Sequence, residues 1–281
     1  MEKQKIGIIT EDICSLPERM IRDFGIEIVK TKLYFPEWEK FSEKNLYQLM
    51  RQTKATPKTS APPPGDYLNV YKKLIQNCEN ILVITVSSKL SACFNSAFQA
   101  KEMFDDPEKI FLFDSSQAVA GQGLLILKVI ELMREGKEMK ETLNALEELK
   151  RKIKFFGFLK TTYWAEKIGR VNHWQTIAFK ILKGLGIQPY LGIKKGEVKL
   201  TGFNLWTVDE FEAMFNQLRH EAKKGKIRVG INYTDNIDFA FKLKERVEKE
   251  LKAEVLFVSM VPPIVGANSG PGTLLAACYH V

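Results

Sequence analysis

The sequence has few of the residues that build metal sites, disulfide frameworks and histidine-based active sites. It has four cysteines and three histidines in 281 residues, and no two cysteines form a Cys-x-x-Cys pair. This pattern argues against a zinc site and suggests no disulfide framework. The sequence also lacks a secretory signal and any apolar run of the roughly 18 residues that a membrane span needs. We therefore expect a soluble protein that stays in the cytoplasm.

Three motifs of nucleotide-binding and hydrolytic proteins are missing as well. There is no GxxxxGK[ST] P-loop, no GxGxxG after the first predicted strand and no GxSxG. These absences weigh against a P-loop nucleotide site, a Rossmann dinucleotide site and an α/β-hydrolase triad. The function of a small-molecule kinase subunit or of a hydrolase on a related scaffold remains an alternative only because the fold alone does not exclude it.

The composition is that of a globular protein, with 45% hydrophobic and 27% charged residues. The length suffices for one large domain or two modest ones. The net charge is +8, but lysines alternate with glutamates over 140–154 and 242–252, as on solvated helix faces. Since no nucleic-acid-binding motif accompanies this charge, we expect no nucleic-acid partner.

The first half of the chain alternates strand and helix patterns. Apolar strands are predicted at 5–10, 26–33, 81–86 and 109–114. A loop is predicted over 59–65, and a helix is predicted to begin near Leu90 and Ser91. This rhythm predicts a mainly parallel sheet flanked by helices.

The second half follows a different pattern. Residues 189–202 resemble a hairpin around a Gly turn, and 227–261 read as strand, helix and strand. We therefore predict an α/β fold of two lobes. An N-terminal α/β lobe spans 1–155, and a C-terminal α/β lobe with a hairpin spans 156–281.

Hydroxyl side chains gather in the loops that follow the predicted strands, where parallel sheets bind ligands. The loop at 87–93 joins a buried strand directly to a helix. Free N–H groups and the helix dipole favour an anion there, so Ser91 could hold a carboxylate or a phosphate. Helix capping alone would also explain serine at such a junction.

An ordered set of segments spanning nearly the whole chain resembles the DegV family, whose members bind fatty acids. None of the segments is very specific alone, but their order is. The segments are Ile6–Asp12 with Leu16-Pro17, Thr59–Pro63, Ser87–Cys93 with Ser96-Ala97, Asp114-Ser115 with Gly121 and Gly123, Gly169–Val171, and Gly266–Gly272.

The resemblance implies two lobes with a long-chain fatty acid between or within them, its tail in an apolar tunnel. It implies no cofactor besides this ligand and no catalysis by the chain alone. Family members of the fatty-acid kinase B kind present the fatty acid to a separate kinase subunit, which forms the acyl phosphate. The head-group residues that the resemblance implies here are Thr59, Ser60, Ser91, Cys93, Arg170 and Asn268.

Two head-group positions depart from the family pattern. Cys93 stands in place of a threonine, and a thiol is a weaker donor than a hydroxyl. Asn268 stands in place of a histidine, so this position cannot titrate near neutral pH. Fatty-acid binding is therefore a firmer expectation than kinase coupling, and a lipid-binding sensor or buffer without a kinase is the alternative.

Overall fold

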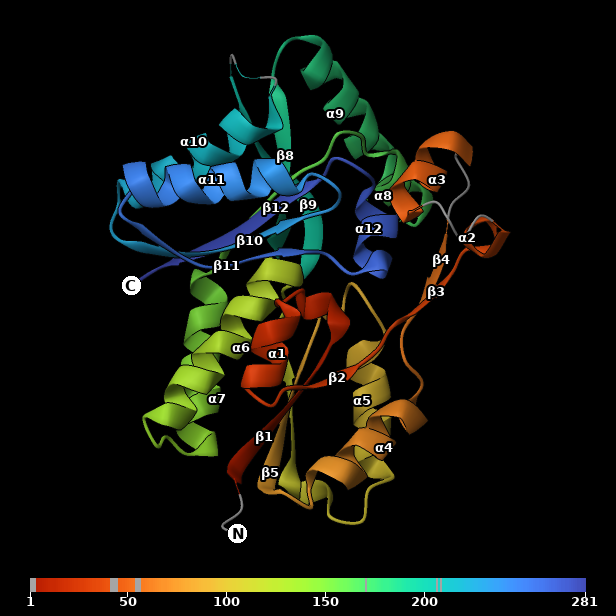
Figure 1. Ribbon diagram of the computed structural model, residues 1–281, viewed down its shortest axis with the longest axis vertical. Coiled ribbons are helices and arrows are strands. Elements are labelled where there is room, and N and C mark those ends of the chain that lie inside the picture. The colour runs from red at the N-terminus through yellow and green to blue at the C-terminus, as the bar shows by residue number, and fades with distance from the viewer. Residues whose placement is uncertain (1–3, 41–44, 54–56, 170, 206, 208) are drawn as a thin grey trace.

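The computed structural model describes residues 4–40, 45–53, 57–169, 171–205, 207 and 209–281. Among the predicted head-group residues, Arg170 lies outside these ranges. Figure 1 shows two lobes stacked along the long axis, each built around its own sheet. The architecture confirms the predicted α/β fold, with a parallel sheet in the first lobe and a hairpin-containing sheet in the second.

The first sheet is entirely parallel, in the order β2-β1-β5-β6. Its strands are β1 (Gln4–Glu11), β2 (Glu27–Val29), β5 (Cys78–Thr85) and β6 (Ile110–Asp114). Side chains alternate across a strand, so Ile8 packs with one helix layer and Ile9 with the other.

Helices cover both faces of this sheet, which accounts for its nearly continuous apolar strands. The layer on the side of Ile8 contains α1 (Glu18–Asp23), α6 (Val119–Arg134) and α7 (Met139–Lys152). The layer on the side of Ile9 contains α4 (Pro64–Leu74) and α5 (Cys93–Glu102). Two single turns of 3-10 helix complete the lobe, η1 (Asp12–Cys14) and η2 (Pro107–Lys109).

The second sheet is mixed, in the order β11-β10-β12-β7-β8-β9. Its strands are β7 (Lys154–Phe158), β8 (Gln188–Lys194), β9 (Glu197–Asn204), β10 (Ile227–Tyr233), β11 (Ala253–Met260) and β12 (Leu274–His280). Strands β8 and β9 form the predicted hairpin around Lys195 and Gly196, both with positive φ. Helices α10 (Glu210–Ala222) and α11 (Ile237–Glu250) pack on one face. Helices α8 (Tyr163–Lys167) and α9 (His173–Gly184) share an apolar cluster with Leu191 of β8.

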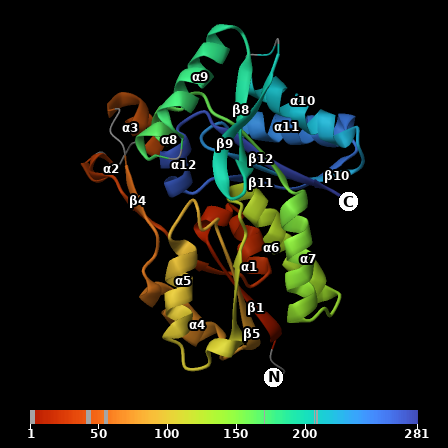
Figure 2. The same ribbon diagram turned by 180° about the vertical axis from the view of Figure 1, so that it is seen from behind.

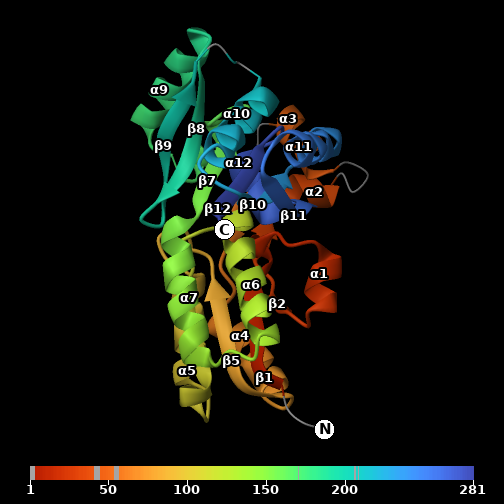
Figure 3. The same cartoon turned by 90° about the vertical axis from the view of Figure 1, so that its left-hand side faces the viewer.

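Helix α6 joins the two lobes because it packs against both sheets. Its apolar side chains belong to one cluster with Ile8 and Leu82 of the first sheet and with Phe257 and Ala277 of the second. Val119, at its first turn, packs against Leu275 of β12. The side view of Figure 3 shows this end of α6 directly beneath the second sheet. A helix held between two sheets is apolar on nearly all sides, as the sequence of α6 is.

A short arm links the lobes on another side. Strands β3 (Lys32–Tyr34) and β4 (Lys58–Ser60) form a two-stranded antiparallel ribbon. The ribbon leads to α2 (Pro36–Lys40) and α3 (Leu46–Thr53), beside α12 (Pro263–Ser269) and α8 in Figure 1. Apolar packing of Leu49 and Met50 with Trp164 and Ala267 holds the arm there.

Three predicted elements were placed wrongly. The predicted strand 26–33 is two strands in different sheets, because Asp12 Oδ1 accepts from the N–H and hydroxyl of Thr31 at 3.2 and 2.8 Å and turns the chain. The predicted loop 59–65 contains the end of β4 and the first turn of α4, since proline suits the first helical position. Helix α5 begins at Cys93, later than predicted.

The boundary predicted between 155 and 156 falls inside β7, and it stays a prediction. Among the helices of the described ranges, none has both the length and the apolar character that crossing a membrane requires.

Candidate functional site

A largely apolar cavity of about 360 Å³ lies between the two lobes. Its lower wall comes from residues beyond the carboxyl ends of β1 and β5, as expected for a parallel sheet. Its upper wall comes from β7, β8, β9, β12 and α12. The volume lies within the roughly 300–1,000 Å³ typical of small-molecule pockets.

The lining of the cavity is mostly apolar and has a few polar side chains. Of the 22 described residues that line the cavity, 17 have apolar side chains or none, and five have a hydroxyl or an amide. The described lining contains no charged side chain. The polar five are Thr59, Ser60, Ser91, Asn268 and Ser269. Such a site suits an amphipathic ligand with a long apolar part and one small polar group.

Four of the six predicted head-group residues line this one cavity although they are far apart in sequence. Thr59 and Ser60 come from β4, Ser91 precedes α5, and Asn268 is in the last turn of α12. Ser269, which sequence reasoning missed, also lines it, but its hydroxyl donates to the carbonyl of Val265 at 2.9 Å.

Asn268 has an unused polar atom at the cavity. Its amide oxygen is buried and has no hydrogen-bond partner among the described residues. Buried polar atoms are nearly always paired, so this oxygen is free to accept a hydrogen bond from a ligand. A half-turn of the amide presents its N–H instead, so Asn268 can meet either an acceptor or a donor.

Cys93, the fifth predicted residue, is fully buried behind Ser91 rather than at the cavity surface. Its Sγ lies 3.1 Å from the Ser91 Oγ, and its backbone N–H donates to the same oxygen at 3.4 Å. Burial raises the pKa of the Cys93 thiol to about 12. The thiol is therefore neutral, and its neighbours are the hydroxyls of Ser91 and Tyr67.

A buried carboxylic acid, Glu11, lies beyond Cys93. Glu11 is fully buried at the end of β1. Tyr67 donates to its Oε1 at 2.5 Å, while the Val86 N–H and the Gln122 amide donate to its Oε2, each at 3.0 Å. Burial raises the pKa of Glu11 from 4.5 to about 7, against the lowering effect of these hydrogen bonds. The predicted first strand ends at residue 10, and the sequence gave no sign that Glu11 is buried.

The hairpin β8-β9 covers the cavity from above. Its apolar residues Leu191, Ile193 and Val198 line the cavity, and Figure 2 shows the hairpin reaching down to the first lobe. The hydroxyl of Ser87 donates to the carbonyl of Gly196 at 2.8 Å. A side chain at position 196 would clash with this hydroxyl, so the turn needs glycine.

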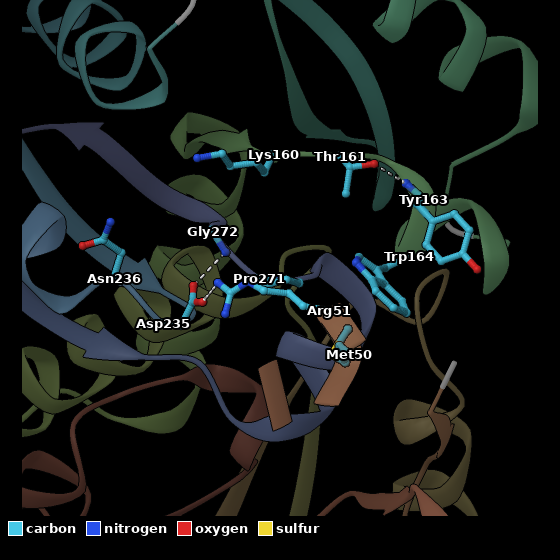
Figure 4. Close-up of a pocket in the computed structure, with 10 residues that line it drawn as sticks. All are labelled: Met50, Arg51, Lys160, Thr161, Tyr163, Trp164, Asp235, Asn236, Pro271 and Gly272. Atoms are coloured by element: carbon cyan, nitrogen blue, oxygen red, sulfur yellow. Dashed lines mark hydrogen bonds and ion pairs between the residues drawn. The ribbon is translucent and has the colours of Figure 1, made fainter. Parts of the chain in front are cut away.

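A second pocket, of about 620 Å³, lies beside α3, α8 and the turn after α12 (Figure 4). Two of its three charged side chains pair with each other: Arg51 binds Asp235, which also accepts from the Gly272 N–H at 2.7 Å, and Lys160 is the third. Polar groups already paired offer little to a ligand, so the cavity between the lobes is the better candidate. Within the described residues, no cluster of three or more His, Cys, Asp or Glu side chains could hold a metal ion.

Comparison with known proteins gives the same family throughout. A family model described as "Uncharacterised protein, DegV family" matches residues 5–279. A DegV domain-containing protein of Clostridium acetobutylicum is 28% identical over 275 residues, which are 95% of each chain.

Solved structures share the fold. A DegV family protein from Thermus thermophilus, described as fatty-acid-binding, matches with a TM-score of 0.85 and 26% identity over 99% of this chain and 100% of its own. A stearic acid-binding protein from Eubacterium ventriosum matches in fold with a TM-score of 0.82 and 20% identity over 99% and 98%.

Proposed function

This chain belongs to the DegV family, and from that premise we propose that it binds a long-chain fatty acid in the cavity between its lobes. The observation that carries the proposal is the cavity itself, which is apolar over most of its surface and has its hydroxyls and amide on a few residues. Fatty-acid binding by the relative from Thermus thermophilus supports the same ligand class.

The energetics favour a long tail. Each buried methylene contributes about 0.8 kcal/mol, so ten of them contribute roughly 8 kcal/mol. Association costs about 4–15 kcal/mol in lost translational and rotational freedom. A short acid would therefore bind weakly, and the tail dominates the affinity while the head group sets the orientation.

The carboxylate is held by Thr59, Ser60, Ser91 and Asn268 in this proposal. Hydroxyl and amide groups donate to a carboxylate, and such charge-assisted hydrogen bonds contribute about 1.5–3 kcal/mol each. Arg170 is proposed to supply positive charge, on the resemblance alone. Cys93 acts through Ser91, whose hydroxyl it contacts.

We further propose that the chain presents its fatty acid to a separate kinase subunit, which phosphorylates the carboxyl group. The resemblance supports this step. Asn268 and Cys93, which replace the usual histidine and threonine, favour the alternative of a lipid sensor or buffer without a kinase.

Two experiments test these statements in turn. Organic extraction of the purified protein followed by mass spectrometry should recover one fatty acid per chain, and an extract without lipid, together with no uptake of added fatty acid, would refute the binding proposal. Addition of a fatty-acid kinase subunit and ATP should then yield acyl phosphate. Stoichiometric lipid without acyl phosphate would select the sensor or buffer.

A further inference from the structure

A chain of neighbouring side chains leads from Ser91, at the cavity, to the buried Glu11. Ser91 Oγ, at the cavity, lies 3.1 Å from Cys93 Sγ. The hydroxyl of Tyr67 donates to Glu11 Oε1 at 2.5 Å, and the Cys93 thiol and this hydroxyl influence each other's pKa, which places them as neighbours. Each of the three linking groups can donate one hydrogen and accept another, so the whole chain can run in either direction.

The direction depends on the proton of Glu11. An ionised Glu11 can only accept, so Tyr67 donates to it, Cys93 donates to Tyr67, and Ser91 donates to Cys93. Ser91 then presents its oxygen lone pairs to the cavity. A protonated Glu11 can donate to Tyr67, and the chain reverses until Ser91 donates into the cavity. Only the second arrangement suits a carboxylate.

Repulsion between charges also favours a protonated Glu11 when the ligand is bound. An ionised Glu11 and an ionised ligand would be two like charges in an apolar region, which disfavours ionisation of one of them. The titratable groups that face Glu11 are Tyr67 and Tyr71 of α4, Cys93 of α5, and Cys14 of η1. Gln122 of α6 is neutral.

The nearest charged neighbours do not offset this repulsion. Asp12, next in the chain, is bound to Thr31, and the charge of Lys30 acts on Asp12. Burial is the largest influence on the pKa of Glu11, and none of the described Lys, Arg or His side chains forms an ion pair with it. Within the described residues, a proton is therefore the means by which Glu11 itself can become neutral.

We propose that Glu11 takes up a proton when the fatty-acid carboxylate binds, so that Ser91 becomes a donor to the ligand. The proposal rests on the proposed fatty-acid site. Glu11 is a positioning residue in it, because it acts on the ligand through Tyr67, Cys93 and Ser91. The atoms balance: one proton moves from solvent to a Glu11 carboxylate oxygen, and no covalent bond of the ligand changes.

Linkage sets the expected size of the effect. Since the pKa of Glu11 is about 7, half of the chains are competent to bind at pH 7 and about 1% at pH 9. The apparent Kd should therefore rise about fifty-fold between pH 7 and pH 9. A free carboxyl group is ionised throughout this range, so titration of the unbound ligand does not contribute.

The test uses delipidated full-length protein and parinaric acid, a fluorescent long-chain fatty acid. Its Kd is measured by fluorescence at pH 7, 8 and 9, and proton uptake is measured by calorimetry at pH 8 in two buffers of different ionisation enthalpy. The wild type should take up close to one proton per ligand. Glu11→Gln, which keeps the shape but cannot ionise, should take up none and bind with a pH-independent Kd.

Glu221→Gln is the matched control. Glu221 is also a buried glutamate, but it lies in α10, paired with Lys154 and Lys224, away from the cavity. This variant should keep the wild-type proton uptake. The wild-type calorimetry needs no variant and stands even where Glu11→Gln fails to fold.

The outcomes separate this inference from the proposed function. Tight binding of parinaric acid without proton uptake would overturn the inference and leave the fatty-acid site intact. Uptake that persists in Glu11→Gln would place the proton elsewhere and also overturn it. No binding at any pH would overturn both.

Discussion

Replacement of Glu11 by glutamine should change how the stability of the ligand-free protein depends on pH. Burial raises the pKa of Glu11 from 4.5 to about 7, so the folded chain holds this proton more tightly than the unfolded chain. The stabilisation by this proton is complete below pH 4.5 and is lost as the pH rises through about 7. Glutamine cannot lose a proton, so Glu11→Gln keeps its stability.

The magnitude follows from the shift. Each pKa unit corresponds to about 1.4 kcal/mol, so the difference in unfolding free energy between Glu11→Gln and the wild type should grow by roughly 3 kcal/mol from pH 4.5 to pH 8. The glutamine oxygen can accept from Val86, and its amide can donate to Tyr67, so the buried hydrogen bonds have replacements. At pH 8 the variant should be the more stable protein.

Urea denaturation of both delipidated proteins at pH 4.5, 6 and 8 measures this difference. The control is Glu221→Gln. Burial alone would raise the pKa of Glu221, but its pairs with Lys154 and Lys224 lower it overall, so the free-energy difference between this variant and the wild type should change with pH in the opposite sense. A free-energy difference between Glu11→Gln and the wild type that stays constant from pH 4.5 to pH 8 would refute the raised pKa of Glu11.

Three further predictions concern the cavity and its walls. Ser91→Ala should weaken fatty-acid binding about tenfold or more, since a hydrogen bond to a charged group contributes roughly 1.5–3 kcal/mol. Unchanged affinity in a displacement assay would remove Ser91 from the site. Ser269→Ala is the control, because that hydroxyl already donates to the carbonyl of Val265. Ala165→Leu should fill part of the cavity that Ala165 lines and shorten the longest acid retained, as seen by mass spectrometry of lipid extracts; an unaltered chain-length profile would contradict an acyl chain at that wall. Gly266→Ala should lower stability by about 1–3 kcal/mol, because its methyl group would clash with the Tyr47 ring in the packing of α12 on α3; a urea midpoint equal to that of the wild type would show that Tyr47 moves freely.

Local sequence patterns predicted much of the architecture. The apolar run at 81–86 has the length and β-branched content of a buried strand, and the Gly turn at 196 matches a hairpin. Such signals depend on neighbours in sequence, which is why a parallel sheet flanked by helices and the hairpin β8-β9 were predicted correctly. The strand 26–33 was misplaced because Asp12, 19 residues before Thr31, turns the chain there.

The sequence by itself determined the family, the α/β class and the residues from which a head-group site could be built. Ordered motifs survive as short segments, so Thr59, Ser60, Ser91 and Asn268 were identified without knowledge of their positions. Tertiary structure alone decided that these four residues line one cavity and that Cys93 lies behind Ser91. It also decided that Glu11 is buried with a raised pKa. Burial and the distance between remote segments arise from packing of the whole chain, and a carboxylate after a strand looks the same in sequence whether water or Tyr67 surrounds it.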